Sequence, residues 1–184
     1  MATQVCSIFS EYKRDCRISP AETVSVADIR HKPVISIGRF SNPWTLRLLA
    51  PLSYQTQLSG PPPDGLTSER MVVENTPARQ IQMGKIGPAA LKLPMTADYA
   101  IVAKFHSDVT YGMAVVVAGL GRQGTHTGEL YVCSPEDMRT ILSRAPKGWT
   151  GVNFEAVLKV NLIQGSSATL KLLLRNSGRG AFVD

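Results

Sequence analysis

The chain lacks long apolar runs and has few cysteines. No apolar stretch approaches the ~20 residues of a membrane-spanning helix, so the sequence predicts no membrane span. The three cysteines are an odd number without zinc-site spacing, which argues against a closed disulfide framework. The first residues lack the apolar core of a signal peptide. We therefore expect a cytoplasmic protein.

The sequence also has no dense block of positive charge. Lys and Arg number 20 against 14 Asp and Glu, a net charge of +6, but they are scattered singly along the chain. The densest cluster, Lys13, Arg14 and Arg17, is diluted by Glu11 and Asp15. A nucleic-acid-binding face is usually more concentrated, so this pattern favours a solvated basic surface over nucleic acid as a partner.

Several enzyme signatures are missing. The GxSxG, P-loop and HExxH motifs do not occur, and the carboxylates show no clear pairing. Cys133 and His126 could lie on one side of a helix, but a cysteine at the end of an apolar run is more typical of a buried structural thiol. The sequence therefore leans towards a non-catalytic protein.

What is present is the composition of a globular protein, 43% hydrophobic and 18% charged. Residues 34–37 predict a buried strand that ends at Gly38, and Asn42 with Pro43 predicts the start of a helix. Together these form the opening of a β-α unit. We expect an N-terminal arm or partial upstream segment over 1–30, one domain over 31–176 and a flexible tail over 177–184.

The second half has clearer patterns. The apolar run 113–118 predicts a central strand buried on both faces, because neither face alternates with polar residues. Strands at 98–105, 154–163 and 168–174 are also expected, the last two as a hairpin. Helices are predicted over 125–132 and from Ser134. Between the halves, residues 53–97 predict an irregular or hairpin-like excursion with a Pro/Gly-rich loop at 59–68.

Strands alternating with helices predict an α/β fold. The specific expectation is a three-layer sandwich with a mixed, mainly parallel sheet, flavodoxin- or Rossmann-like, ending in a β-hairpin. In such sheets ligands bind beyond the carboxyl ends of the strands. The loops after residues 37 and 118 both leave such ends, so they would face one crevice if their strands are parallel neighbours.

The strongest candidate site is the glycine-rich segment 119–129, which contains GxGxxG between a buried strand and a helix. Free backbone N–H groups and the positive end of a helix favour an anion there. A dinucleotide site is disfavoured because no acidic residue follows at the expected place. The predicted ligand-binding residues are Arg39, Ser41, Asn42, Gly119, Gly121, Arg122, Gly124, Thr125 and Glu129.

Two parts of the chain are similar to one known domain. Residues 24–49, with Ala27-Asp-Ile-Arg30 and Asn42-Pro-Trp-Thr-Leu-Arg47, and the later segments Gly124-Thr125, Ser134-Pro-Glu136 and Ala145-Pro-Lys-Gly-Trp149 carry the likeness. They resemble an uncharacterised α/β domain of predicted regulatory proteins from soil bacteria of the Acidobacteria type. The resemblance spans about residues 24–174 and implies a signalling role. The family has no activity to carry over.

These observations lead to one expectation and two alternatives. The expectation is a non-catalytic ligand-binding or protein-interaction (sensory) domain of a bacterial signalling protein, with a small-molecule or anionic ligand or a protein partner. The first alternative is a small enzyme, a hydrolase or nucleotide-dependent enzyme, using the 119–129 glycine loop. The second is a basic nucleic-acid-binding module. The sequence identifies no cofactor or metal.

Overall fold

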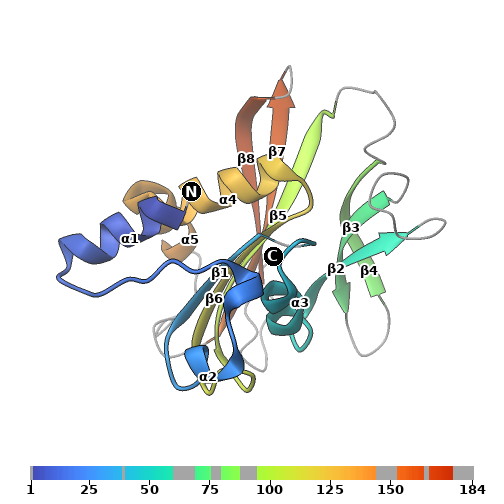
Figure 1. The fold of residues 1–184 in the computed structure, drawn as a ribbon. Coiled ribbons are helices and arrows are strands. Elements are labelled where there is room, and N and C mark those ends of the chain that lie inside the picture. The colour runs from blue at the N-terminus through green and yellow to red at the C-terminus, as the bar shows by residue number, and fades with distance from the viewer. Residues whose placement is uncertain are drawn as a thin grey trace.

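A computed structural model describes residues 2–38, 40–59, 69–75, 80–87, 95–143, 153–163 and 166–175 (Figure 1). The elements in chain order are α1 (Ala2–Glu11), η1 (Ala21–Thr23), α2 (Val26–Ile29), β1 (Val34–Ile37), α3 (Pro43–Leu49), β2 (Tyr54–Ser59), β3 (Glu69–Asn75), β4 (Gln80–Ile86), β5 (Ala97–Ser107), β6 (Gly112–Gly119), α4 (Arg122–Cys133), α5 (Pro135–Ser143), β7 (Phe154–Ile163) and β8 (Ser166–Arg175). Among the helices of the described residues there is no candidate for a membrane-spanning segment.

The larger sheet has five strands in the order β1-β6-β5-β7-β8. β1 and β6 are parallel, while β6/β5, β5/β7 and β7/β8 are antiparallel. Val116 and Val117 on β6 are adjacent and both are fully buried. Because adjacent side chains of a strand point to opposite faces, β6 is buried on both faces, which confirms the prediction for 113–118.

The expectation of a mainly parallel, flavodoxin- or Rossmann-like three-layer sandwich is wrong. One strand pair of the larger sheet is parallel, and β2, β3 and β4 form a second, wholly antiparallel sheet. β5 and β6 are separated by the short segment 108–111, and a parallel crossover needs a dozen or more residues. The apolar runs predict that these strands are buried, but not the direction in which each strand runs. The expected terminal hairpin is present as β7 and β8.

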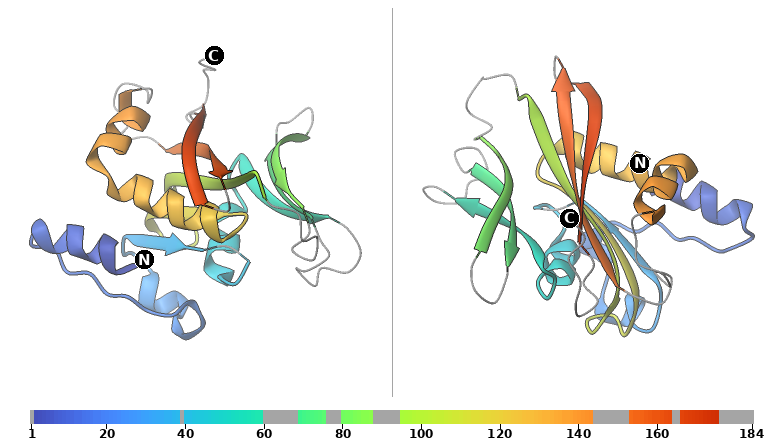
Figure 2. Two further views of the ribbon diagram at one scale, coloured as in Figure 1. Left: turned by 90° about the horizontal axis from the view of Figure 1, so that it is seen from above. Right: turned by 180° about the vertical axis from the view of Figure 1, so that it is seen from behind.

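Different elements cover the two faces of the larger sheet. On one face, α3 and the β2-β3-β4 sheet share a core that includes Leu48, Val72 and Val116. On the other face, Tyr131 of α4 packs with Val102 and Leu158 of the sheet. The views in Figures 1 and 2 show α4 and α5 on one side of the larger sheet and the small sheet on the other. For residues 53–97 the sequence predicts an irregular or hairpin-like excursion, and the structure has the three-stranded β2-β3-β4 sheet there. Most of the predicted Pro/Gly-rich loop at 59–68 lies outside the described residues.

A buried carboxylate links the two sheets. Glu155 on β7 is only 1% exposed. Its Oε1 accepts a hydrogen bond from the Ser53 N–H at 3.2 Å, and its Oε2 accepts one from the Tyr54 N–H at 2.9 Å. These donors lie at the start of β2, so Glu155 fixes the point where the chain enters the small sheet.

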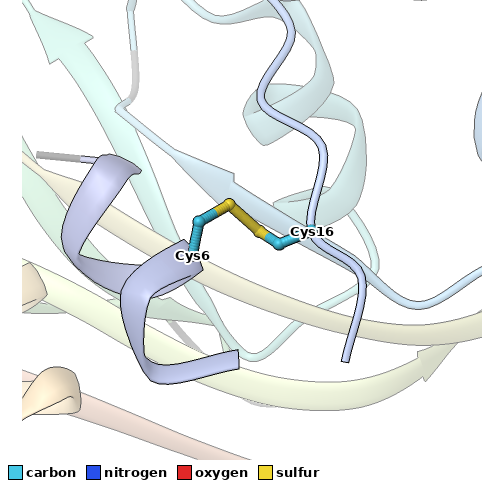
Figure 3. Close-up of a disulfide and its surroundings, with 2 residues drawn as sticks. All are labelled: Cys6 and Cys16. Carbon is cyan, nitrogen blue, oxygen red and sulfur yellow. A yellow bond between two sulfur atoms is a disulfide. The ribbon is translucent and has the colours of Figure 1, made fainter. Parts of the chain in front are cut away.

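The N-terminal arm contains a disulfide between Cys6 and Cys16, while Cys133 is a free thiol (Figure 3). The odd cysteine count, which argues against a closed framework, is compatible with this arrangement, because one disulfide forms and one cysteine stays unpaired. The bond joins α1 to the extended segment that follows it. Farther along the arm, the Trp44 indole N–H of α3 donates a hydrogen bond of 3.2 Å to the carbonyl of Ala21.

Candidate functional site

The structure brings the two predicted loops to one edge of the larger sheet. β1 and β6 are parallel neighbours with Ile37 opposite Val117, and the Gly38 N–H donates to the Val117 carbonyl at 3.0 Å. α3 follows β1 and packs on one face, whereas α4 follows β6 and packs on the other (Figure 1). In α/β sheets, ligands bind beyond the carboxyl ends of adjacent strands whose following helices lie on opposite faces, so this edge is the candidate site.

In the first loop, Asn42 is engaged by the chain itself. Its Oδ1 accepts hydrogen bonds from the backbone N–H groups of Trp44, at 3.0 Å, and Thr45, at 3.3 Å, so it caps α3. Its Nδ2 donates to the Ile37 carbonyl at 3.1 Å and to Ser36 Oγ at 3.3 Å. The helix start that the sequence predicts is confirmed, and Asn42 uses its polar atoms to build it.

In the second loop, the donors of the glycine motif bind a carboxylate of the chain itself. Asp98 is fully buried at the start of β5. Its Oδ1 accepts hydrogen bonds from the N–H groups of Gly121, at 3.0 Å, and Tyr99, at 2.7 Å, and its Oδ2 accepts one from the Gly124 N–H at 2.6 Å. An internal anion thus takes the place that a ligand phosphate occupies in nucleotide-binding loops of this kind.

Two opposing effects act on the pKa of Asp98. Burial raises the pKa of this carboxyl above its usual value and is the larger effect. The three backbone N–H donors and the positive charge of Arg70 act in the opposite direction. Asp98 is therefore a buried acid whose ionised form depends on the glycine loop that surrounds it.

The glycines of the motif are explained by close packing. A Cβ atom added to Gly121 would lie 2.7 Å from Asp98 Oδ2, and one added to Gly124 would collide with the Tyr99 carbonyl. A Cβ on Gly119 would collide with the Thr125 backbone N. Thr125 Oγ1 closes the turn, because it accepts from the Gly119 N–H at 3.2 Å and donates to the Gly121 carbonyl at 3.1 Å. The GxGxxG spacing therefore serves the packing of this turn onto β5.

Sequence reasoning missed Arg70, which joins both loops to the small sheet. Arg70 lies on β3, and its Nη1 donates to the Leu120 carbonyl at 3.1 Å. Its guanidinium carbon lies 5.3 Å from the centre of the Phe40 ring, within the range of a cation–π contact. No local pattern singles out Arg70, because its partners lie far away in the chain and on different elements.

The other predicted residues divide into three groups. Ser41 and Arg122 are exposed at the rim of the two loops. Arg39 lies outside the described residues. Glu129 is not at the loops: it lies two turns farther along α4, roughly 12 Å from the Gly121 end of the helix, and it is buried.

The thiol–imidazole pair considered from the sequence has the wrong electrostatics for nucleophilic catalysis. Burial, and then the negative charge of Glu129, raise the pKa of the Cys133 thiol, whereas an activated cysteine needs a lowered pKa. His126 is exposed on α4. Within the described ranges, no three His, Cys, Asp or Glu side chains are grouped so that they could hold a metal ion.

Comparison of the chain with protein-family models, with curated proteins and with solved structures finds no match.

Proposed function

We propose that this chain is a non-catalytic ligand-binding or interaction domain of a bacterial regulatory protein. The observation that carries the proposal is the meeting of the β1 and β6 loops at an edge where α3 and α4 diverge to opposite faces. The resemblance of residues 24–174 to a domain of regulatory proteins points to the same kind of role.

The class of ligand that we propose follows from which groups remain at the rim. The N–H groups of Gly121 and Gly124 already bind Asp98, which argues against a nucleotide phosphate on the glycine loop. Arg122 is exposed at the first position of α4, where a cation and the positive end of the helix dipole act together. Ser41 adds an exposed hydroxyl from the other loop. We therefore propose a ligand that carries a carboxylate.

A thermal-shift screen tests this proposal. The panel contains di- and tricarboxylates, inorganic phosphate and nucleotides, and each ligand is added at a range of concentrations. A ligand present at 100 times its Kd should stabilise the protein by about 2.7 kcal/mol, which gives a clear rise in Tm. We expect carboxylates to raise the Tm of the wild-type protein and to lose this effect in Arg122→Ala.

Arg139→Ala is the matched control, because Arg139 is an exposed arginine on α5, away from the two loops. This variant should keep the wild-type response. A carboxylate response that survives in Arg122→Ala would disprove the placement of the site. Stabilisation by nucleotides alone, or by no member of the panel, would disprove the proposed ligand class.

The Cys6–Cys16 disulfide is relevant to the cellular compartment of the protein. Disulfides persist in oxidising compartments and are rare in the cytoplasm. We therefore propose that the domain operates outside the cytoplasm, in contrast to the expectation drawn from the first residues. Fractionation of the native host with alkylation of free thiols tests this: Cys6 and Cys16 should resist alkylation until a reductant is added, whereas rapid alkylation of both without reductant would contradict the proposal.

A further inference from the structure

The most unusual side chain outside the candidate site is Glu129 on α4. It is only 1% exposed, and neither carboxylate oxygen has a hydrogen-bond partner among the described residues. An ionised carboxylate that is buried without a partner costs several kcal/mol, so such a group is neutral or its surroundings open. Buried polar groups in proteins are normally paired, and this exception calls for an explanation.

The element that closes over this part of α4 is α1. The amino-terminal end of α1 lies beside α4 in Figure 1 and in both views of Figure 2, and the two helices are in contact. The sheet-facing side of α4 is marked by Gly128, whose added Cβ would lie 3.0 Å from Val117 and 3.3 Å from Ala100. Glu129 is the next residue, turned about 100° around the helix from Gly128.

α1 is held to the domain weakly. Val5 is its only buried side chain. A helix of this length is marginal in water without tertiary packing. The Cys6–Cys16 disulfide closes the segment onto itself and leaves the contact with α4 to packing. Moving α1 away from α4 would therefore cost little, and the disulfide would keep its local shape.

Two positively charged groups act on the pKa of Glu129 in addition to burial. Burial raises the pKa of Glu129, and the positive charges of the amino terminus, at the α1 side, and of His126, on α4, oppose this to a smaller extent. The neighbouring titratable group is the Cys133 thiol.

The other elements packed on α4 offer the Glu129 carboxylate no hydrogen-bond partner among the described residues. β6 carries no titratable side chain. On β5, Asp98 is engaged by the glycine loop, and Lys104 and His106 lie near the opposite end of the strand. Tyr99 alternates with Asp98 and packs against the core on the other face. On β7, Glu155 and Lys159 alternate with the residues that face α4 and so point to the other face. α1 and α5 add Glu11, Glu136, Asp137 and Arg139. β8 also contacts α4 and carries Lys171 and Arg175, which pair in register with Lys159 and Glu155 of β7.

We propose that the protonation of Glu129 controls the contact between α1 and α4. α1 packs against α4 while the Glu129 carboxyl is neutral, and loss of its proton releases α1. The released state lets water reach the carboxylate, which removes the cost of burying the charge. Cys133, one turn farther along α4, is half-buried with α1 docked, so its access to solvent should increase when α1 leaves. The contact lies away from the Gly121–Arg122 loop, so it does not depend on any ligand bound there.

The direction of the pH effect follows from the raised pKa. A carboxyl whose pKa is higher with α1 docked than with α1 released favours docking at pH values below the released-state pKa. This contribution is lost as the pH rises through the docked-state pKa. Each unit of difference between the two pKa values should weaken docking about tenfold.

Hydrogen–deuterium exchange of the full chain measures the effect directly. Protection factors of the α1 amides, corrected for intrinsic exchange, are compared from pH 4 to pH 9 in wild-type protein, Glu129→Gln and Glu22→Gln. We expect α1 protection to fall at least tenfold with rising pH in the wild type, while the amides of β6 stay protected. Glutamine has the shape of a neutral glutamate and does not ionise, so the α1 protection of Glu129→Gln should be high and independent of pH. Glu22 is exposed, so Glu22→Gln should behave as the wild type does.

Two results would overturn the proposal. One is α1 protection in the wild type that does not change across the pH range. The other is an unchanged pH dependence in Glu129→Gln. If Glu129→Gln does not fold, the wild-type profile is combined with alkylation of Cys133, the one thiol outside the disulfide, with each rate corrected for the fraction of thiolate. Protection of α1 must fall and the corrected alkylation rate must rise over the same pH range, and a change in only one of them contradicts the mechanism.

Discussion

The backbone N–H of Gly124 donates a 2.6 Å hydrogen bond to Oδ2 of Asp98, 26 residues earlier in the chain. This bond joins the first turn of α4 to the start of β5. With the bond from the Gly121 N–H to Oδ1, it fills the glycine loop with an anion that belongs to the fold. The loop should therefore depend on Asp98 for stability.

Asp98→Ala should destabilise the protein by about 3 kcal/mol or more, because the N–H groups of Gly121 and Gly124 lose their acceptor in a buried place. Urea unfolding followed by circular dichroism measures the change. Asp98→Asn keeps one acceptor oxygen and should lose less. A change below about 0.5 kcal/mol in the alanine variant would show that water replaces the carboxylate without loss.

Gly124→Ala should be more destabilising than Gly128→Ala, although both place alanine inside α4. At Gly124 the new Cβ meets the Tyr99 carbonyl, which cannot move without shifting β5. At Gly128 it meets side-chain atoms of Val117 and Ala100, and the gain in helix propensity of about 1 kcal/mol offsets part of the strain. Tm values of the two variants test the order, and equal losses would contradict the packing argument.

Glu155→Ala should loosen the small sheet. Its two oxygens accept from the Ser53 and Tyr54 N–H groups, so truncation leaves both donors without this partner at the start of β2. We expect a loss of about 2–4 kcal/mol and faster amide exchange in β2 and β3 than in β6. Glu155→Gln retains one acceptor oxygen, so its stability should lie between that of the wild type and that of Glu155→Ala. Uniform loss of protection across both sheets would show that Glu155 supports the whole fold instead.

Removing the disulfide should affect the arm and spare the core. In Cys6→Ser the chain-entropy contribution, about 3 kcal/mol for a loop of this size, is lost from α1. α1 buries only Val5, so the Tm of the domain should change little while the α1 amides exchange faster. Cys16→Ser removes the same bond from its other end and should give the same result. A large drop in Tm for Cys6→Ser would mean that α1 is integral to the core.

Local patterns in the sequence predict individual elements well. The glycine exit after β1 and the Asn42 cap with Pro43 predict α3, and Ser134 Oγ accepts from the Asp137 N–H at 3.2 Å as the predicted helix start requires. The apolar run predicts β6 and its burial. These signals are local because caps and burial depend on neighbours within one or two turns.

The arrangement of the elements could not be predicted in the same way. Strand direction depends on the connections between strands, so the local patterns predict a mixed, mainly parallel sheet, which the antiparallel pairs of β5 contradict. The partners of the glycine loop, Asp98 and Arg70, lie on other strands, and neither has a local signature. The glycine motif itself predicts a tight turn between β6 and α4, which is confirmed, but it does not say whether the anion at that turn comes from a ligand or from the chain.

The antiparallel direction of β5 explains why the acceptor at the glycine turn comes from the chain itself. Because β5 runs opposite to β1 and β6, its amino end meets their carboxyl ends at the same edge, and Asp98 stands at that end. In a sheet with only parallel strands, the amino end of β5 would lie at the opposite edge, and Asp98 would be far from the glycine loop. Here a reversed strand carries a buried carboxyl group to the first turn of the helix, where it accepts hydrogen bonds from the Gly121 and Gly124 N–H groups, so these donors are satisfied before anything binds.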